Sequence, residues 1–151
     1  MDVPAHPNRS LFVNIPVSDL DRSIEFFTKL GFTFNPLFTD ETATCMLVGE
    51  QAYFMIMKRE RFLEVAKGKD IGNPAATVPA MYAFDVESRE RVDELADIAE
   101  ANGGTGDGSQ DHGFMYSRAF RDPDGHYFEV LWMDPVAAQQ GPAEHGVEVT
   151  A

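Results

Sequence analysis

Hydrophobic and polar positions follow the same order in both halves of this chain. In each half an apolar strand leads into an amphipathic helix, which begins after a hydroxyl or carboxyl residue and ends at a glycine, and three further strands follow. The predicted strands are residues 11–17, 32–38, 43–48 and 52–58, then 81–86, 105–110, 114–121 and 126–133. The pattern therefore predicts an α+β fold built from two βαβββ modules.

The two modules span residues 11–58 and 80–134, and a linker at 59–79 joins them. Because a repeated half-domain must cover its apolar face, we expect the modules to pair into a single domain over residues 11–134. Residues 1–10 are expected to form an N-terminal extension and residues 135–151 a flexible tail.

Side-chain alternation along the strands separates two faces. One face of each module is uniformly large and apolar, so it is expected to pack under the helix. The other face mixes apolar residues with a few polar groups, which is the usual composition of a small-molecule site. The predicted ligand-binding residues on this mixed face are Phe12, Asn14, Met55, Met57, Met81, Asp85 and Tyr127.

Glu129 is the candidate catalytic residue, because a carboxylate among apolar neighbours is poorly solvated and can act as a general acid or base. The competing interpretation is that Arg118, Arg121 or a tyrosine hydroxyl satisfies this carboxylate. His112 and His126 are interpreted as surface histidines. The sequence contains no zinc-site spacing of His or Cys, so no metal ligand is assigned.

The formal net charge of −13 repels phosphate backbones, which argues against a nucleic-acid partner. No apolar run is long enough to span a bilayer and no signal peptide is visible, so we expect no membrane association. The single Cys45 lies in an apolar run and is interpreted as a small buried hydrophobe of a cytoplasmic protein.

Three motifs carry a resemblance to a known superfamily. They are residues 14–27 (Asn-Ile-Pro-Val-Ser-Asp-Leu-Asp-Arg-Ser-Ile-Glu-Phe-Phe), residues 30–32 (Leu-Gly-Phe), and residues 120–125 (Phe-Arg-Asp-Pro-Asp-Gly) followed by Phe128 and Glu129. In this order and in register with the repeat, they resemble the vicinal oxygen chelate superfamily. That superfamily includes glyoxalase I, bleomycin- and fosfomycin-resistance proteins and extradiol dioxygenases.

The resemblance implies that the modules form a cupped mixed sheet with helices on its outer face, and that the chain forms a homodimer. Metal-dependent members place one ligand on each of four strands, at positions that correspond here to Phe12, Met55, Met81 and Glu129. Only Glu129 suits a hard or borderline divalent ion, because phenylalanine has no donor atom and thioethers are soft ligands. We therefore expect no cofactor, and a divalent metal only if unassigned residues supply further ligands.

The leading hypothesis is a metal-independent protein that binds a small, mostly apolar organic molecule in the cupped sheet. Glu129 and Asn14 would anchor the polar group of that ligand. The alternative is a lyase, isomerase or dioxygenase-like enzyme that uses Glu129 as general base, with or without a divalent metal. A third possibility is that side chains of the protein fill the cavity and that it acts only through its dimer.

Overall fold

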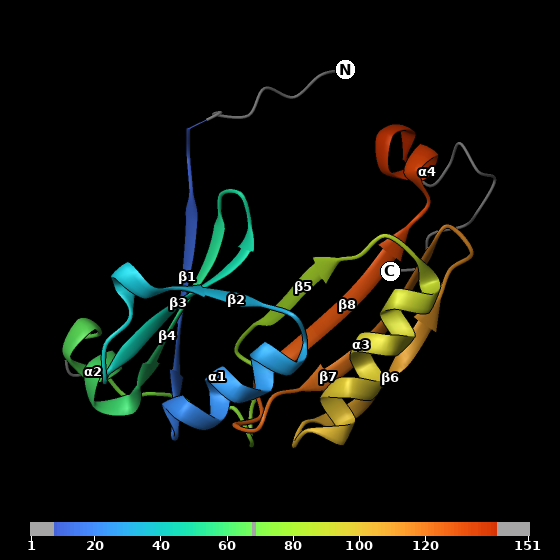
Figure 1. Ribbon diagram of the computed structural model, residues 1–151. Helices are drawn as coiled ribbons and strands as arrows, with labels where there is room; N and C mark the ends of the chain where they lie inside the picture. Colours follow the sequence, from blue (N-terminus) through green and yellow to red (C-terminus); the bar gives the residue numbers. More distant parts are fainter. Residues whose placement is uncertain (1–7, 68, 142–151) are drawn as a thin grey trace. The chain divides into compact units, whose positions relative to one another are not determined.

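Two four-stranded mixed sheets organise the chain, as Figure 1 shows for the computed structural model, which describes residues 8–67 and 69–141. Contacts divide the chain into two compact units, Met1–Ile71 and Gly72–Ala151, with one sheet in each. The strand order is β1-β4-β3-β2 in the first unit and β5-β8-β7-β6 in the second. The predicted α+β class and the repeated βαβββ order are confirmed.

The first unit places its helix directly after its first strand. Its elements are β1 (Leu11–Val17), α1 (Leu20–Lys29), β2 (Thr33–Asn35), the 3-10 turn η1 (Pro36–Phe38), β3 (Ala43–Gly49), β4 (Ala52–Lys58) and α2 (Arg59–Val65). The carboxylate of Asp19 caps α1 by accepting a hydrogen bond from the backbone N–H of Arg22 at 3.1 Å. β4 pairs in parallel with β1 and antiparallel with β3.

The strand predicted over residues 32–38 is wrong in its second part, because β2 ends at Asn35 and η1 follows. Pro36 has no N–H to donate to a sheet, whereas its fixed φ suits the first position of a helical turn. The side chain of Asn35 caps this turn by accepting a hydrogen bond from the backbone N–H of Leu37 at 3.0 Å. The turn moves Phe38 out of the strand.

The second unit repeats the order with a longer helix. Its elements are β5 (Met81–Asp85), α3 (Arg89–Ala101), β6 (Thr105–Asp111), β7 (Met115–Arg121), β8 (Tyr127–Met133) and α4 (Pro135–Gln140). Ser88 caps α3, in agreement with the predicted helix start after a hydroxyl or carboxyl residue. Arg118 of β7 forms ion pairs with Asp97 at 2.8 Å and Asp93 at 3.3 Å, both on α3. α3 therefore covers the sheet face to which Arg118 belongs.

The flexible tail predicted from residue 135 begins instead with the helix α4. Asp134 caps this helix by accepting hydrogen bonds from the backbone N–H groups of Val136 and Ala137. The side chain of Ala137 is buried, so the helix is anchored to the unit. The rest of the predicted tail, and residues 1–7 of the predicted extension, lie outside the described residues.

A tight turn of residues 122–125 joins β7 to β8. The N–H of Gly125 donates to the carbonyl of Asp122 at 2.9 Å, and Gly125 adopts a φ of 97°, which favours glycine. A Cβ atom at Gly125 would lie 2.8 Å from the Cα of Ala75, so a side chain has no room there. The segment that contains Pro74 and Ala75 therefore packs directly against this turn.

The carboxyl group of Asp122 is buried beneath this turn, with 3% of the residue exposed. Its Oδ1 accepts hydrogen bonds from the backbone N–H groups of His126 at 2.8 Å and Asp124 at 3.1 Å. Its Oδ2 has no partner among the described residues. Burial raises the pKa of Asp122 to about 6, although the nearby His126 acts in the opposite direction.

We expect Asp122→Asn to flatten the dependence of stability on pH. Because the pKa of Asp122 is higher in the folded than in the unfolded chain, its neutral form stabilises the fold. This contribution to the free energy of unfolding, about 1–3 kcal/mol, is fully present below pH about 4 and is lost as the pH rises through about 6. Asparagine keeps one oxygen that accepts the N–H groups of Asp124 and His126, but it has no carboxyl proton to lose. Melting temperatures measured from pH 4 to 8 should therefore fall less with rising pH in the variant.

The exposed Asp70→Asn is the matched control, since it removes one carboxylate from the same chain without burial. Equal pH profiles for the wild type and Asp122→Asn would contradict the assignment of a raised pKa to Asp122.

Candidate functional site

One face of the first sheet carries an apolar recess. Phe12 of β1 lies opposite Tyr53 of β4 in the parallel pair, and their rings stack with centroids 4.9 Å apart. Met55 lies next along β4 on this face, opposite Cys45 of β3. The recess has a volume of about 210 Å³, and we call it the apolar pocket; its lining residues are Phe12, Asn35, Phe38, Cys45, Tyr53 and Met55.

Few polar groups reach the apolar pocket with free hydrogen-bonding capacity. The Oδ1 of Asn35 already accepts the N–H of Leu37, and the hydroxyl of Tyr53 donates to the carbonyl of Glu50 at 2.9 Å. Cys45 is buried, as the sequence predicts, and burial raises the pKa of its thiol. The thiol therefore stays neutral and contributes an apolar surface.

The other predicted residues of the first unit lie outside the lining of this pocket. Asn14 pairs with Met55 across β1 and β4 but is exposed, and its amide donates a long hydrogen bond of 3.4 Å to the carbonyl of Phe12. Met57 pairs with Pro16 and is buried. Of the predicted residues in this unit, the pocket brings together Phe12 and Met55.

Glu129 occupies the middle of the open face of the second sheet. It is opposite Ala83 of β5 on one side and Ala119 of β7 on the other, so two methyl groups are its lateral neighbours. No hydrogen bond or ion pair to its carboxylate occurs within residues 8–67 and 69–141. The interpretation that Arg118 or Arg121 satisfies Glu129 is wrong, because these arginines bind Asp97 and Asp107 instead.

Met81, Asp85 and Tyr127 share this open face with Glu129. Met81 pairs with Tyr127, and Asp85 pairs with Leu131, one row beyond Glu129 on the other side. Met81 and Asp85 are exposed at the edge strand, whereas Tyr127 is half-buried. Burial, followed by the charge of Glu129, raises the pKa of the Tyr127 phenol.

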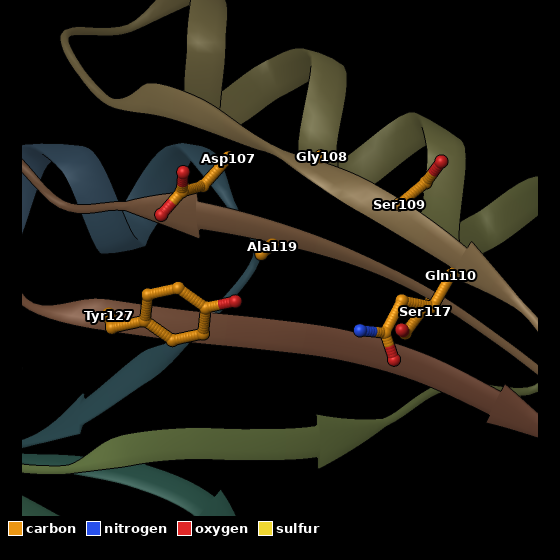
Figure 2. A pocket seen from close by; sticks show the side chains of 7 residues that line it. All are labelled: Asp107, Gly108, Ser109, Gln110, Ser117, Ala119 and Tyr127. Atoms are coloured by element: carbon orange, nitrogen blue, oxygen red, sulfur yellow. The ribbon is translucent and has the colours of Figure 1, made fainter. Parts of the chain in front are cut away.

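A second recess lies on the same unit and is polar. Figure 2 shows it between β6, β7 and β8, with the hydroxyl of Tyr127 and the amide of Gln110 pointing toward its centre. Its volume is about 100 Å³, and we call it the polar recess; its lining residues are Asp107, Gly108, Ser109, Gln110, Ser117, Ala119 and Tyr127. Ser117 is 2% exposed.

The two histidines differ in their surroundings. His126 is 6% exposed at the turn before β8, so the prediction of a surface histidine is wrong for this residue. The backbone N–H of His126 donates to Oδ1 of Asp122 at 2.8 Å, and its backbone carbonyl accepts the N–H of Asp122 at 3.1 Å. His112 is half-buried, and its Nε2 lies 3.4 Å from the Oε1 of Gln110.

The four positions at which the resemblance implies metal ligands do not fit a divalent metal. Phe12 and Met55 lie on the first unit in an apolar lining, and Met81 offers an exposed thioether on the second. Glu129 is the one oxygen donor among them. Over the described ranges, no group of three or more His, Cys, Asp or Glu residues could hold a metal ion. Within the same ranges, no helix is long and apolar enough to cross a membrane.

Several lining residues are absent from the sequence-based prediction. Phe38 is missed because Asn35-Pro36 begins a turn, a signal that was present in the sequence. Ser117 lies on the open face of β7 and could be found by alternation from Ala119. Gln110 could not, because the register of β6 shifts between Gly106 and Ser109 and alternation no longer predicts its face.

Comparison with known proteins finds a family model that matches part of the sequence and solved structures that match most of the fold. A family model described as bleomycin resistance protein-like N-terminal matches residues 9–49. No curated protein matches the sequence at a significant level. A hypothetical protein of S. aureus, SA1046, is 26% identical, with a TM-score of 0.70 over 82% of this chain and 92% of that chain.

Two further solved structures share the fold at lower identity. A glyoxalase/bleomycin resistance protein/dioxygenase family enzyme from Burkholderia phytofirmans PsJN is 19% identical, with a TM-score of 0.68 over 81% of this chain and 96% of that one. The fosfomycin resistance protein FosX from Listeria monocytogenes is 18% identical, with a TM-score of 0.58 over 86% of this chain and 94% of that chain.

Proposed function

Starting from the fold that this chain shares with the glyoxalase and bleomycin-resistance proteins of the vicinal oxygen chelate superfamily, we propose that it binds a small, mostly apolar organic molecule without a metal ion. The observation that carries the proposal is the apolar pocket of the first unit. Its wall combines three aromatic rings with a thioether and a neutral thiol, and such linings are typical of small-molecule sites.

The volume of the apolar pocket limits the ligand. A dry cavity of about 150 Å³ lined by apolar side chains binds benzene, so about 210 Å³ accommodates one substituted ring. Drug-sized ligands need pockets of about 300–1,000 Å³. We therefore propose that the ligand is a single-ring aromatic compound. It contacts the stacked rings of Phe12 and Tyr53 and the ring of Phe38, which also lines the pocket.

We expect Phe38→Ala to weaken binding of a single-ring ligand about tenfold, because it removes one aromatic wall of the pocket. Phe38 is 65% exposed, so the truncation should leave the fold intact. A panel of substituted phenols and benzoates, screened by thermal shift and followed by calorimetry, provides the measurement.

Leu37→Ala is the matched control, since Leu37 is the adjacent residue on η1, is 86% exposed and does not line the pocket. Its affinity should equal that of the wild type. If Leu37→Ala and Phe38→Ala weaken binding equally, the ligand binds elsewhere and the proposed site is wrong.

A second candidate function is an enzyme in which Glu129 acts as general base. The carboxylate of Glu129 has no hydrogen-bond or ion-pair partner in the described part of the chain, and it stands between two alanines, which leave it accessible. Such a group is free to take a proton from a bound carbon acid or water molecule. For either function, we also propose the homodimer and the cytoplasmic location that are expected from the sequence.

Glu129→Gln distinguishes the two functions, because glutamine keeps the size of the side chain and removes its basicity. If the protein is an enzyme, the variant should bind its substrate normally and lose about 10²–10⁴-fold in kcat. If it is a binding protein, ligand affinity should change at most severalfold and no turnover should occur in either form. Product formation under single-turnover conditions is the readout.

Metal independence predicts that no divalent ion specifically stabilises the protein. A ligand that binds only the native state raises the melting temperature by mass action, so EDTA-treated protein should melt equally with nickel, zinc, manganese or iron(II) added. The same panel on Glu129→Ala is the control. A rise that one metal produces in the wild type and that Glu129→Ala abolishes would establish a metal site and overturn this part of the proposal.

A further inference from the structure

We propose that the polar recess of the second unit binds the protonated amino group of a small ligand, a primary ammonium. Its hydroxyl and carboxylate oxygens come from three adjacent strands, β6, β7 and β8 (Figure 2). The proposal does not rest on the apolar pocket, because every residue that it uses lies in the other unit.

Ser117 is the first reason to expect a ligand in this recess. The residue is 98% buried, yet its hydroxyl has no hydrogen-bond partner among residues 8–67 and 69–141, and it lines the recess. The Ser117 oxygen keeps access to the recess, unlike the fully buried unpartnered oxygens of Ser23 and Asp122. A hydrogen-bonding group inside the recess would give this hydroxyl a partner.

The hydroxyl of Tyr127 is a second oxygen without a hydrogen-bond partner that lines the same recess. No hydrogen bond of this hydroxyl occurs in the described part of the chain, although the residue is half-buried. The phenol keeps its proton, because burial and the negative charge of Glu129 raise its pKa. A neutral phenol and a serine hydroxyl each present lone pairs, which accept the N–H bonds of an ammonium group.

The charges around the recess favour a cation over a neutral or anionic group. The Nε and Nη2 atoms of Arg121 each lie 3.1 Å from Oδ2 of Asp107, so these two charges offset one another. The remaining Nη1 of Arg121 donates to the carbonyl of Gly125 at 3.2 Å. Glu129 has no ion-pair partner and is opposite Ala119, which lines the recess, so one negative charge stays uncompensated.

The size of the recess limits what enters it. A volume of about 100 Å³ lies well below the 300–1,000 Å³ of a drug-sized site, so it holds a small group only. A primary ammonium with one or two carbons fits this volume and brings three N–H donors for oxygens of the lining residues.

Ethylammonium chloride is the probe for this site, titrated into the ¹⁵N-labelled full chain at pH 7 and followed by amide chemical shifts. Tetramethylammonium chloride has the same charge but no N–H bond, and ethanol has a similar shape but no charge. We expect saturable shifts for ethylammonium alone, confined to amides of residues 107–110, 117–119 and 127. Ser117→Ala and Tyr127→Phe should each weaken its affinity about fivefold to tenfold, since each removes one acceptor.

Ser23→Ala is the matched control. The hydroxyl of Ser23 has no partner either, but Ser23 belongs to α1 of the first unit and does not line the polar recess. Its affinity for ethylammonium should equal that of the wild type. Melting curves of each variant establish that it is folded before titration.

Four outcomes would overturn the proposal. Equal shifts with tetramethylammonium would mean diffuse attraction to an acidic surface, and equal shifts with ethanol would mean a site for neutral hydroxyl groups. Unsaturable shifts would mean that the recess holds only water, and an affinity that Ser117→Ala leaves unchanged would mean that ethylammonium binds elsewhere. Phe38→Ala should leave ethylammonium binding unaffected, so failure of this proposal is distinguishable from failure of the apolar pocket.

Discussion

The register of β4 and β8, one inner strand in each sheet, is the constraint on which the rest of the structure depends. Each has a parallel neighbour on one side and an antiparallel neighbour on the other. Slippage by one residue would exchange the faces of every side chain, exposing Ile56 and Val130 and burying Glu129. The need to bury the apolar side chains of the covered face therefore determines which residues lie on the open face.

That constraint explains why most of the fold could be predicted from the sequence. Alternation over residues 52–58 gives the bounds of β4 unchanged, and the N-cap residues Asp19 and Ser88 are local signals for the two main helices. The fold that the resemblance implies is also the fold of solved glyoxalase/bleomycin resistance/dioxygenase structures, and a bleomycin resistance protein-like N-terminal model matches residues 9–49. Errors occur where local chemistry competes with alternation, at Pro36 and at the helix after Asp134.

The candidate site could be predicted less completely, for physical reasons. Phe12, Met55 and Tyr127, which alternation on regular strands predicts, line the two recesses. Phe38 lies on a 3-10 turn and Gln110 beyond a register shift, so counting along a strand does not reach them. The burial of His126 depends on how the turn folds back on β8, which is a tertiary feature. The two recesses differ in their lining: aromatic side chains dominate the apolar pocket, and oxygen-bearing side chains dominate the polar recess.

The contact between Gly125 and Ala75 determines where a C-terminal fragment of this chain can begin. The repeat in the sequence suggests that a second half begins at residue 80, but Pro74 is buried and Ala75 packs against the turn that shelters Asp122. A fragment that starts at residue 80 would uncover that turn and let water reach the carboxylate. An autonomous C-terminal fragment must therefore begin near residue 72, and insertions between residues 72 and 80 will be tolerated less well than their loop-like composition suggests.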